Sequence, residues 1–312
     1  MKLINIVNNH IFPERRDGLK NNIIRLAKEL GFAIPQMNVN GLIWIEGVLK
    51  AAENQQSPII IGTTDKNIEY LGGYEFILNT IKNKVQAMKI TVPVIVHLDH
   101  GLSVENCKAA VDAGYDSVMF DGSQLPIEEN IKQTKKVVEY AQLHDVLVEG
   151  EVGAVGGEED GLIGQVKYAD IDECVALVKE AKLDTLAPAL GSVHGKYQGE
   201  PNLGFEEMTI IRNQVDIPLV LHGASGISNN DIQRAIKLGH AKINFNTEIN
   251  ISWSKQLRDT LDENKELFNP QKILKPSIQA IELTAEKIIK MCGSNHQSKT
   301  LFKKNGDEKL WS

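Results

Sequence analysis

Cysteine is scarce in this chain, with 3 among 312 residues. Cys107, Cys174 and Cys292 lie far apart and form no C-x-x-C pair. An odd number of isolated cysteines excludes a disulfide framework and a cysteine-rich zinc site. We expect each of them to be a small residue within a helix.

Long apolar runs and a surplus of positive charge are also missing. No stretch of about 18 apolar residues occurs, which excludes a membrane-spanning helix, and the start, MKLINIVNNHIFPERR, is too weakly apolar for a signal peptide. With 34 Lys and Arg against 41 Asp and Glu, the net charge is −7, and phosphate neutralisation needs a basic surface. We therefore expect a cytoplasmic protein that binds neither nucleic acid nor a membrane.

The apolar residues that are present form eight short runs. Hydrophobic residues make up 42% of the chain and charged residues 24%, as in ordinary globular domains, which excludes disorder and coiled rods. The runs are rich in β-branched residues and lack clean alternation, which is typical of strands buried on both faces of a parallel sheet. They are Phe32–Met37, Pro58–Ile61, Pro93–Leu98, Asp116–Phe120, Val146–Val152, Asp184–Leu190, Ile217–Leu221 and Ala241–Phe245.

Helical patterns lie between these runs, the clearest being Ile127–Leu143, Ile171–Ala181 and Asn229–Leu238. Eight strands, each followed by a helix, predict a single α/β domain over 1–312 with the (β/α)8 TIM-barrel fold. A doubly wound open sheet is the rival, but it needs a G-x-G-x-x-G turn after the first strand, and none is present. We also expect extra terminal helices: a leading helical segment at 1–30, a trailing helix at about 277–292, and then a loose tail at 294–312.

Polar residues follow the predicted strands where a barrel carries its active site. His100, His194 and His222 would converge at the barrel mouth, and three imidazoles with an open fourth position suit tetrahedral Zn²⁺. Asp121 and Glu151 could orient these histidines or bind a second metal. For any one of these residues, a hydrogen-bonded strand end is the alternative interpretation.

Glycine-rich segments follow the last three runs. They are Gly191–Gly195, Gly223–Gly226 and Asn244–Thr247. Small residues there let backbone N–H groups approach a phosphate, although tight turns alone would also need glycine. A further segment, 156–161, combines glycines with three acids, and is either a solvated acidic loop or a mobile flap that carries a carboxylate base.

The chain resembles the class II fructose-bisphosphate aldolase family, in its bacterial branch, over nearly its whole length. The segments that carry the resemblance are MNVNGL, SPIIIGTT, VIVHLDHG, CKAAVDAGYDSVMFDGS, VEGEVGAVGGEEDG, LAPALGSVHGKYQGEPNLGFEEM, PLVLHGASGI and KINFNTE. The resemblance implies a zinc-dependent barrel, usually a homodimer or homotetramer, that cleaves or forms a bond next to a dihydroxyacetone phosphate unit.

The resemblance also implies roles for single residues. His100, His194 and His222 would hold the zinc, and Asp121 and Glu151 match carboxylates for a second or displaced metal. Asp99 matches the residue that protonates the C4 hydroxylate in cleavage, Glu159 lies in the flap whose Glu transfers a proton at C3, and Asn244 matches the amide that steadies the enediolate. The residues that match the C1-phosphate cradle, where a monovalent cation (Na⁺ or K⁺) usually sits, are Gly195, Gly223, Ala224, Ser225, Asn244, Phe245, Asn246 and Thr247. No lysine for a Schiff base follows a strand, except Lys196 in the loop after His194.

Three positions for the distal end of the substrate depart from the family pattern. Gln271 is the last residue of the segment Phe-Asn-Pro-Gln. The bacterial branch often has Asp-Pro-Arg at this place, and that Arg reaches the distal phosphate in a neighbouring subunit. Asn250 replaces another phosphate-binding Arg of some relatives, and Thr64, in place of the common Ser, is followed by Asp-Lys instead of a small uncharged pair. Because Arg or Lys normally meets a phosphate dianion, these changes weaken the case for a bisphosphate.

The predicted activity is a reversible, metal-dependent aldol cleavage through a zinc-stabilised enediolate. Fructose 1,6-bisphosphate, cleaved in glycolysis to dihydroxyacetone phosphate and glyceraldehyde 3-phosphate, is the default substrate. The alternatives are tagatose 1,6-bisphosphate, which differs at C4, and a ketose 1-phosphate whose far end is uncharged or differently charged. From other classes, we consider a catalytically silent barrel that binds sugar phosphates, and a two-metal hydrolase, which a single three-histidine cluster fits poorly.

Overall fold

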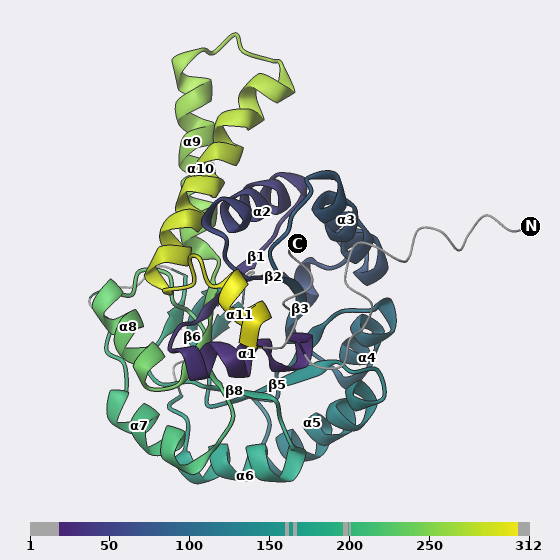
Figure 1. Ribbon diagram of the computed structural model, residues 1–312, viewed down its shortest axis with the longest axis vertical. Coiled ribbons are helices and arrows are strands. Elements are labelled where there is room, and N and C mark those ends of the chain that lie inside the picture. Colours follow the sequence, from purple (N-terminus) through teal and green to yellow (C-terminus); the bar gives the residue numbers. More distant parts are fainter. Residues whose placement is uncertain (1–18, 160–161, 165–166, 196–198, 200, 305–312) are drawn as a thin grey trace, which may run out of the picture.

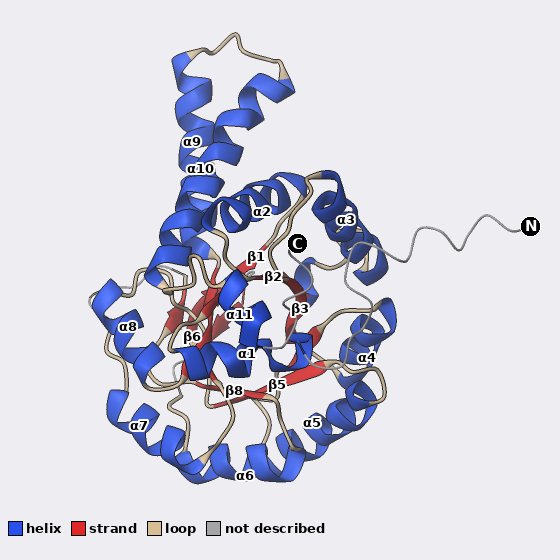
Figure 2. Ribbon diagram, viewed as in Figure 1, coloured by secondary structure: helices blue, strands red, loops and turns tan. Residues whose placement is uncertain are grey.

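A closed parallel barrel forms the centre of the computed structural model, which describes residues 19–159, 162–164, 167–195, 199 and 201–304 (Figures 1 and 2). Each of the eight predicted runs overlaps one barrel strand, so the predicted (β/α)8 fold is confirmed. The strands close in the order β1-β11-β10-β8-β5-β4-β3-β2. They are β1 (Ile34–Asn38), β2 (Ile59–Thr64), β3 (Val94–Gly101), β4 (Ser117–Phe120), β5 (Leu147–Val152), β8 (Thr185–Pro188), β10 (Leu219–Leu221) and β11 (His240–Phe245).

Most of the helices surround the barrel (Figure 2), and their apolar side chains pack in the same core as the strands. Side-chain oxygens of Ser103, Asp170 and Ser228 accept backbone N–H groups at the starts of α4, α6 and α8, which satisfies donors that the first helical turn leaves free. The helices are α2 (Leu42–Gln55), α3 (Tyr74–Ala87), α4 (Val104–Ala113), α5 (Ile127–Gln142), α6 (Ile171–Ala181), α7 (Phe205–Gln214), α8 (Asn229–Lys237), α9 (Thr247–Glu263) and α10 (Pro270–Met291), with a short 3-10 helix η1 (Asp65–Asn67) after β2.

Two further helices, α1 (Leu19–Leu30) and α11 (Ser298–Lys304), lie across the end of the barrel where the strands start (Figure 1). Their apolar side chains form a second core with residues at the starts of the strands, which seals this end and leaves the opposite end for chemistry. The buried members are Ile23, Ile24, Ala27, Phe32, Ile34, Ile60, Ile95, Leu147, Ala241 and Leu301.

The prediction of a loose tail from 294 is wrong for 298–304, which forms α11. Leu301 and Phe302 are buried, and the backbone N–H of Ser298 donates to the carbonyl of Gln56. Leu301 is isolated from other apolar runs in the sequence and is buried in one cluster with residues of α1, which is distant along the chain. The trailing helix α10 also begins before 277, because Asn269 caps it and Pro270 occupies its first turn. Residues 1–18 and 305–312 lie outside the described residues.

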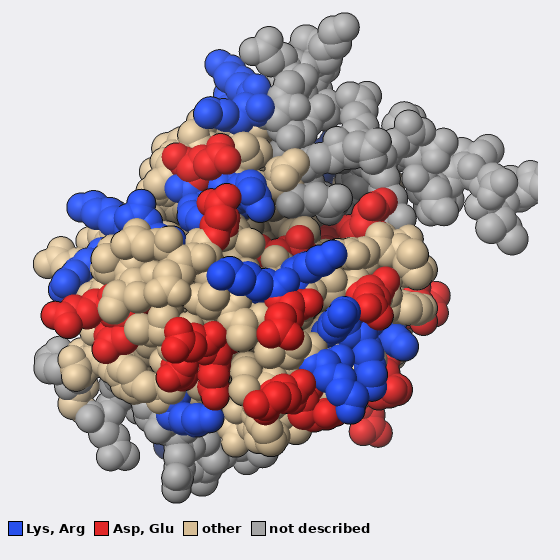
Figure 3. Space-filling view, turned by 90° about the horizontal axis from the view of Figure 1, so that it is seen from below, with Lys and Arg blue, Asp and Glu red and all other residues tan. Residues whose placement is uncertain are grey.

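An arm of two helices, α9 and α10, projects beyond the barrel (Figure 1). Its base is fixed by packing of Trp44 against Trp253, whose ring centroids are 4.8 Å apart. No helix among the described residues is long and apolar enough to cross a membrane. On the face shown in Figure 3, the described acidic and basic side chains are interspersed, and neither sign forms a continuous patch.

His240 at the start of β11 makes the stability of the barrel depend on pH. It is 1% exposed, and its Nδ1–H donates to the Ala235 carbonyl at 3.0 Å. Burial lowers the pKa of His240 from 6.5 to about 4, although the hydrogen bond opposes this shift. Between these two pKa values, the unfolded chain binds a proton that the folded state does not. The contribution of His240 to stability is therefore fully present above pH 6.5 and is lost as the pH falls from 6.5 to about 4.

We expect this residue alone to lower the free energy of unfolding by about 3 kcal/mol between pH 7 and pH 4. Urea unfolding of the metal-free protein at both pH values, with His240→Leu as the comparison, measures this contribution. The variant should have the smaller pH dependence. His97 keeps part of that dependence in both proteins, because burial and the neighbouring Lys242 lower the pKa of His97 to about 3. Equal pH dependence in the two proteins would contradict the assignment.

Candidate active site

Three histidines from separate strand ends meet at the open end of the barrel. His100 lies in β3, His222 follows β10, and His194 lies in β9 (Val193–His194). One ring nitrogen from each lies within 4.8 Å of the others, so these side chains could hold a metal ion. His100 has φ +51°, an uncommon conformation for a residue with a side chain, next to a register shift in β3. Strain of this kind concentrates at functional sites, where the surrounding structure fixes it.

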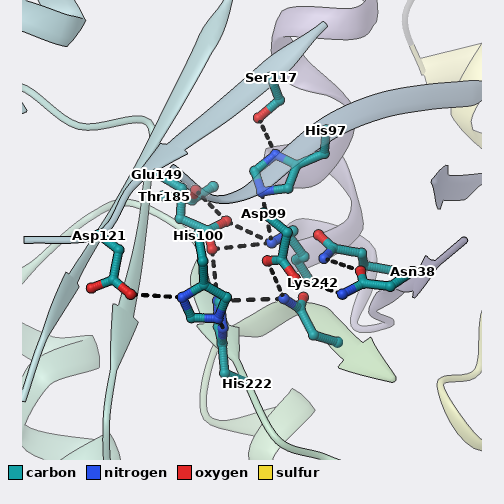
Figure 4. A network of polar contacts seen from close by, with 12 residues as sticks. Asn38, His97, Asp99, His100, Ser117, Asp121, Glu149, Thr185, His222 and Lys242 are labelled. Carbon is teal, nitrogen blue, oxygen red and sulfur yellow. Dashed lines mark hydrogen bonds and ion pairs between the residues drawn. The ribbon is translucent and has the colours of Figure 1, made fainter. Parts of the chain in front are cut away.

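Carboxylates orient two of these rings (Figure 4). The Nδ1–H of His100 donates to Asp121 at 2.8 Å, and the Nε2–H of His222 donates to Glu149 at 2.8 Å. The other nitrogens, His100 Nε2 and His222 Nδ1, then face each other at 3.1 Å with lone pairs. Burial also lowers the pKa of His222, which favours its neutral ring. This donor set fits a nitrogen-binding cation such as Zn²⁺.

A second group that could hold a metal ion consists of His100, Asp121 and Glu151. Glu151 is 1% exposed, and its Oε2 has no hydrogen-bond partner among the described residues. Burial and then the charge of Asp121 raise the pKa of Glu151 well above its usual range. For Asp121, hydrogen bonds from His100 and Ser123 outweigh burial and lower the pKa. The predicted Asp121 and Glu151 are therefore brought together beside the histidines.

A charged pair beneath the histidines was missed by sequence reasoning. Lys242 points from β11 into the barrel, and its Nζ lies 2.8 Å and 3.1 Å from the two oxygens of Glu149. Both side chains are 1% exposed. Burial alone would raise the pKa of Glu149, but the Lys242 ammonium and the hydrogen bond from His222 hold it well below its usual range. Lys242 therefore keeps Glu149 ionised as the acceptor that orients His222.

Asp99 lies beside this group on the inner wall (Figure 4). It is 1% exposed and accepts hydrogen bonds from Asn38 at 2.9 Å and from Asn244 at 3.1 Å. Burial alone would raise the pKa of Asp99, but electrostatic interactions with the neighbouring His100, His222 and Lys242 outweigh burial and keep the pKa below its usual range. The predicted catalytic pair, Asp99 and Asn244, is in direct contact.

Two cavities flank the histidines and share His194 as a lining residue. The smaller one includes the start of α9, where the helix dipole and the backbone N–H groups of the first turn favour an anion. Ala224 and Phe245, two residues of the predicted cradle, are buried in the core, so only their backbone atoms are available to it. The residues that line this cavity are Asn38, His194, Gly195, Gly223, Ser225, Asn244, Asn246 and Thr247.

The second cavity has a volume of about 180 Å³ and extends from the histidines toward η1. Thr64, Asp65 and Lys66 line one wall, and Ser123 and Gln124 lie among its other residues. Thr64 is thus at the predicted distal end. The other two distal residues do not line this cavity in their own chain: Asn250 bonds to Asn40 and Trp44, and Gln271 starts α10 at the tip of the arm (Figure 1).

The predicted flap is a β-hairpin joined to β9, the strand that contains His194. Its strands β6 (Gly156–Glu159) and β7 (Leu162–Gly164) pair with each other, and β6 pairs with β9, so that Gly157 is opposite His194. A Cβ atom at Gly157 would lie 2.0 Å from the His194 carbonyl oxygen, and one at Gly223 would lie 2.5 Å from that of Val193. Both glycines are therefore needed for β9 to fit. The side chain of Glu159 and residue Lys196 lie outside the described residues.

A polar barrel mouth with a histidine cluster defines a barrel enzyme with a candidate metal centre. The family model for class II fructose-bisphosphate aldolase matches residues 20–297. The chain therefore belongs to the class II fructose-bisphosphate aldolase family, and it is an aldolase, a lyase that acts on carbon–carbon bonds.

Individual relatives agree with the family. The chain is 54% identical over 272 residues to the 6-phospho-5-dehydro-2-deoxy-D-gluconate aldolase of Shouchella clausii, which covers 87% of this chain and 93% of that protein. It is 51% identical over 254 residues to a fructose-bisphosphate aldolase of Geobacillus stearothermophilus, covering 81% and 88%. The crystal structure of the YdjI aldolase from Escherichia coli K12 superposes with a TM-score of 0.77 at 34% identity, over 89% of this chain and 98% of that chain.

Proposed function

We propose that this aldolase reversibly cleaves 6-phospho-5-dehydro-2-deoxy-D-gluconate to dihydroxyacetone phosphate and 3-oxopropanoate. The observation that carries the proposal is the pair of unlike cavities on either side of the histidines. One offers backbone N–H groups for a phosphate, and the other contains Lys66 as its only lysine or arginine among the described lining residues. The name of the Shouchella clausii relative supports the same substrate.

The chemistry follows from the structure of this substrate. The ketone is at C5 beside the C6 phosphate, the hydroxyl that becomes an aldehyde is on C3, and the carboxylate is C1. Cleavage breaks the C3–C4 bond: the C3 hydroxyl loses its proton, the electron pair of the bond moves to the fragment that bears the ketone, and C4 takes up a proton. A single carboxylate therefore remains at the distal end, which is the differently charged alternative considered from the sequence.

Different residues would bind the metal, transfer the protons and stabilise the developing charge. His100, His194 and His222 would hold Zn²⁺, with Asp121 and Glu151 as a second or displaced position, and when bound the ion supplies a Lewis acid for the ketone. The ionised Asp99 accepts the hydroxyl proton in cleavage and returns it in condensation. This reverses the direction expected from the sequence, because an aldehyde forms only when that hydroxyl is deprotonated. Glu159 on the hairpin is the candidate for proton transfer at carbon, and the Asn244 amide steadies the charge that develops beside Asp99.

Fructose 1,6-bisphosphate is the second candidate, and the Geobacillus stearothermophilus relative supports it. Its distal phosphate is a dianion, which normally needs more than one cationic or bidentate partner. The neutral Asn250 and Gln271 replace arginines that some relatives carry there. Binding of a monovalent cation, cytoplasmic location, a role in glycolysis and a homodimeric or homotetrameric assembly stay predictions.

Exchange of the C3 proton of dihydroxyacetone phosphate in D₂O, followed by NMR, tests the half-reaction without any aldehyde. We expect exchange that stops with a chelator and returns with Zn²⁺. Cleavage rates on the two candidate substrates then decide between them, with the keto-acid phosphate preferred. No exchange by the zinc-loaded, folded protein would favour the silent barrel, and a preference for fructose 1,6-bisphosphate would replace the first candidate by the second.

A further inference from the structure

We propose that Asn250 is a positioning residue that keeps the start of α9 open for the substrate phosphate, an inference that rests on the proposed function. Asn246 occupies the N-cap position of this helix and lines the smaller cavity. Asparagine is among the preferred N-cap residues, because its side-chain oxygen accepts a backbone N–H of the first turn. Asn246 makes no such bond. Its Oδ1 instead accepts a hydrogen bond from Nδ2 of Asn250 at 2.8 Å.

Another asparagine of the same chain has the ordinary arrangement. Asn269 is the N-cap of α10, has an extended backbone with φ −73° and ψ 115°, and accepts the backbone N–H of Lys272 at 3.1 Å. The residue four positions after it is Ile273, whose side chain has no donor. Asn246, with Asn250 at the corresponding position, has φ −132° and ψ −60° and leaves its helix uncapped. An amide donor at the fourth following position therefore distinguishes the two helix starts.

The direction of the Asn250 amide is fixed by its other neighbours. Nε1 of Trp44 donates to Asn250 Oδ1 at 3.0 Å, and an indole N–H can only donate. Nδ2 of Asn40 donates to the same oxygen at 3.1 Å. Because the oxygen of Asn250 is committed to these two donors, its NH₂ group is the end that faces Asn246. The Trp44 ring packs against Trp253 of α9, which holds this donor in place.

The cavity beside the helix start has polar groups for a ligand. Thr247 of the first turn lines it, and so does Ser225, whose hydroxyl accepts the Glu248 N–H at 3.3 Å and can donate its own proton to a phosphate. Asn244 also lines it, is 7% exposed, and has an Oδ1 without a hydrogen-bond partner among the described residues. A hydroxyl of the same substrate can donate to that oxygen. A capping side chain would compete with the phosphate for the backbone N–H groups of the first turn.

Proton exchange of dihydroxyacetone phosphate and of phosphate-free dihydroxyacetone in D₂O tests this role in the zinc-loaded protein. Asn250→Leu keeps the approximate size of the side chain and removes its donor, which releases Asn246 to cap α9. We expect KM for dihydroxyacetone phosphate to rise by about 10- to 100-fold, as for loss of a hydrogen bond to a charged group, with little change in kcat or in exchange of dihydroxyacetone. The Kd of inorganic phosphate, measured by calorimetry, should rise in parallel. Asn54→Leu removes an exposed amide that bonds Glu282 on α10, and should behave as wild type.

A double-mutant cycle separates this role from general support of the fold. Because Asn250 acts through Asn246, Asn250→Leu should weaken phosphate binding no further in an Asn246→Ala background. Additive losses would show that Asn250 acts by another route, and would overturn the inference. Asn250→Ala removes the same donor without adding an apolar side chain, and should give the same shift if Asn250→Leu does not fold.

The outcomes also separate the inference from the proposed function. Wild type that neither exchanges dihydroxyacetone phosphate nor binds inorganic phosphate overturns the proposed function. Wild type that does both, together with Asn250 variants of unchanged phosphate affinity, overturns the role of Asn250 alone. Variants that lose exchange of dihydroxyacetone as strongly as exchange of its phosphate would place the effect at the reacting carbon, and would overturn the inference as well.

Discussion

Replacement of Lys242 by Met is expected to lower the free energy of unfolding by about 3–5 kcal/mol. The reason is the carboxylate that the substitution leaves behind. Glu149 is 1% exposed, has the Lys242 ammonium of β11 as its cationic partner and lies in the interior of the barrel. A buried ionised group without a counter-charge costs several kcal/mol, far more than the loss of an ordinary surface contact. Urea unfolding of the metal-free protein at pH 7 measures the change.

Two comparisons make this result specific to the buried pair. The double variant Lys242→Met/Glu149→Gln removes both charges and should recover a large part of the loss. Lys255→Met breaks a short ion pair with Asp259, 2.6 Å long, on the exposed face of α9, and should lower the free energy of unfolding far less than Lys242→Met. A double variant no more stable than the single one would show that Lys242 stabilises the barrel through packing rather than charge.

Replacement of Gly157 by Ala is expected to lower kcat by at least about 100-fold while the barrel stays folded. The added Cβ would lie 2.0 Å from the His194 carbonyl oxygen, so β9 has to move, and His194 moves with it. The affinity for Zn²⁺, measured by competition with a chromogenic chelator, should fall in parallel. This second measurement separates a displaced ligand from a general loss of activity.

Gly73→Ala is the matched control for this prediction. Gly73 and Gly157 both have φ +94°, a backbone conformation that strains alanine at either position. A Cβ at Gly73, however, would meet no atom within 4 Å. Only the Gly157 variant should therefore lose zinc affinity. Equal behaviour of the two variants would mean that strain, and not the contact with β9, causes the effect.

The fold was predictable because each strand of this barrel is buried on both faces and stands out as a short apolar run. The histidines were predictable for a related reason: they follow those runs at the end where barrels carry chemistry. The role of α11 was not, because the burial of Leu301 depends on α1, at the other end of the chain. No local pattern contains that contact.

A functional role for Lys242 was not predicted, because it is a single charged residue between Ala241 and Ile243 in an apolar run. A signal was nevertheless present. Polar residues recur at every second position in several strands, so that they share one face of each strand. Once the barrel is known, this alternation predicts an inner wall of charged residues. The pairs are His97 and Asp99, Glu149 and Glu151, and Lys242 and Asn244. The partner of each residue, by contrast, depends on the register between strands.

The three-stranded sheet β7-β6-β9 joins the acidic hairpin to His194, a candidate metal ligand, and this connection has a thermodynamic consequence. If the histidines hold a cation, a substrate that fixed the hairpin in one position would also restrain His194 and so raise the affinity of the site for that cation. Reciprocity requires the converse: a bound cation must raise the affinity for substrate by the same factor. The affinity for substrate and the affinity for the cation would therefore depend on one coupling free energy. The two backbone pairings that place Gly156 and Gly157 beside β9 would transmit it.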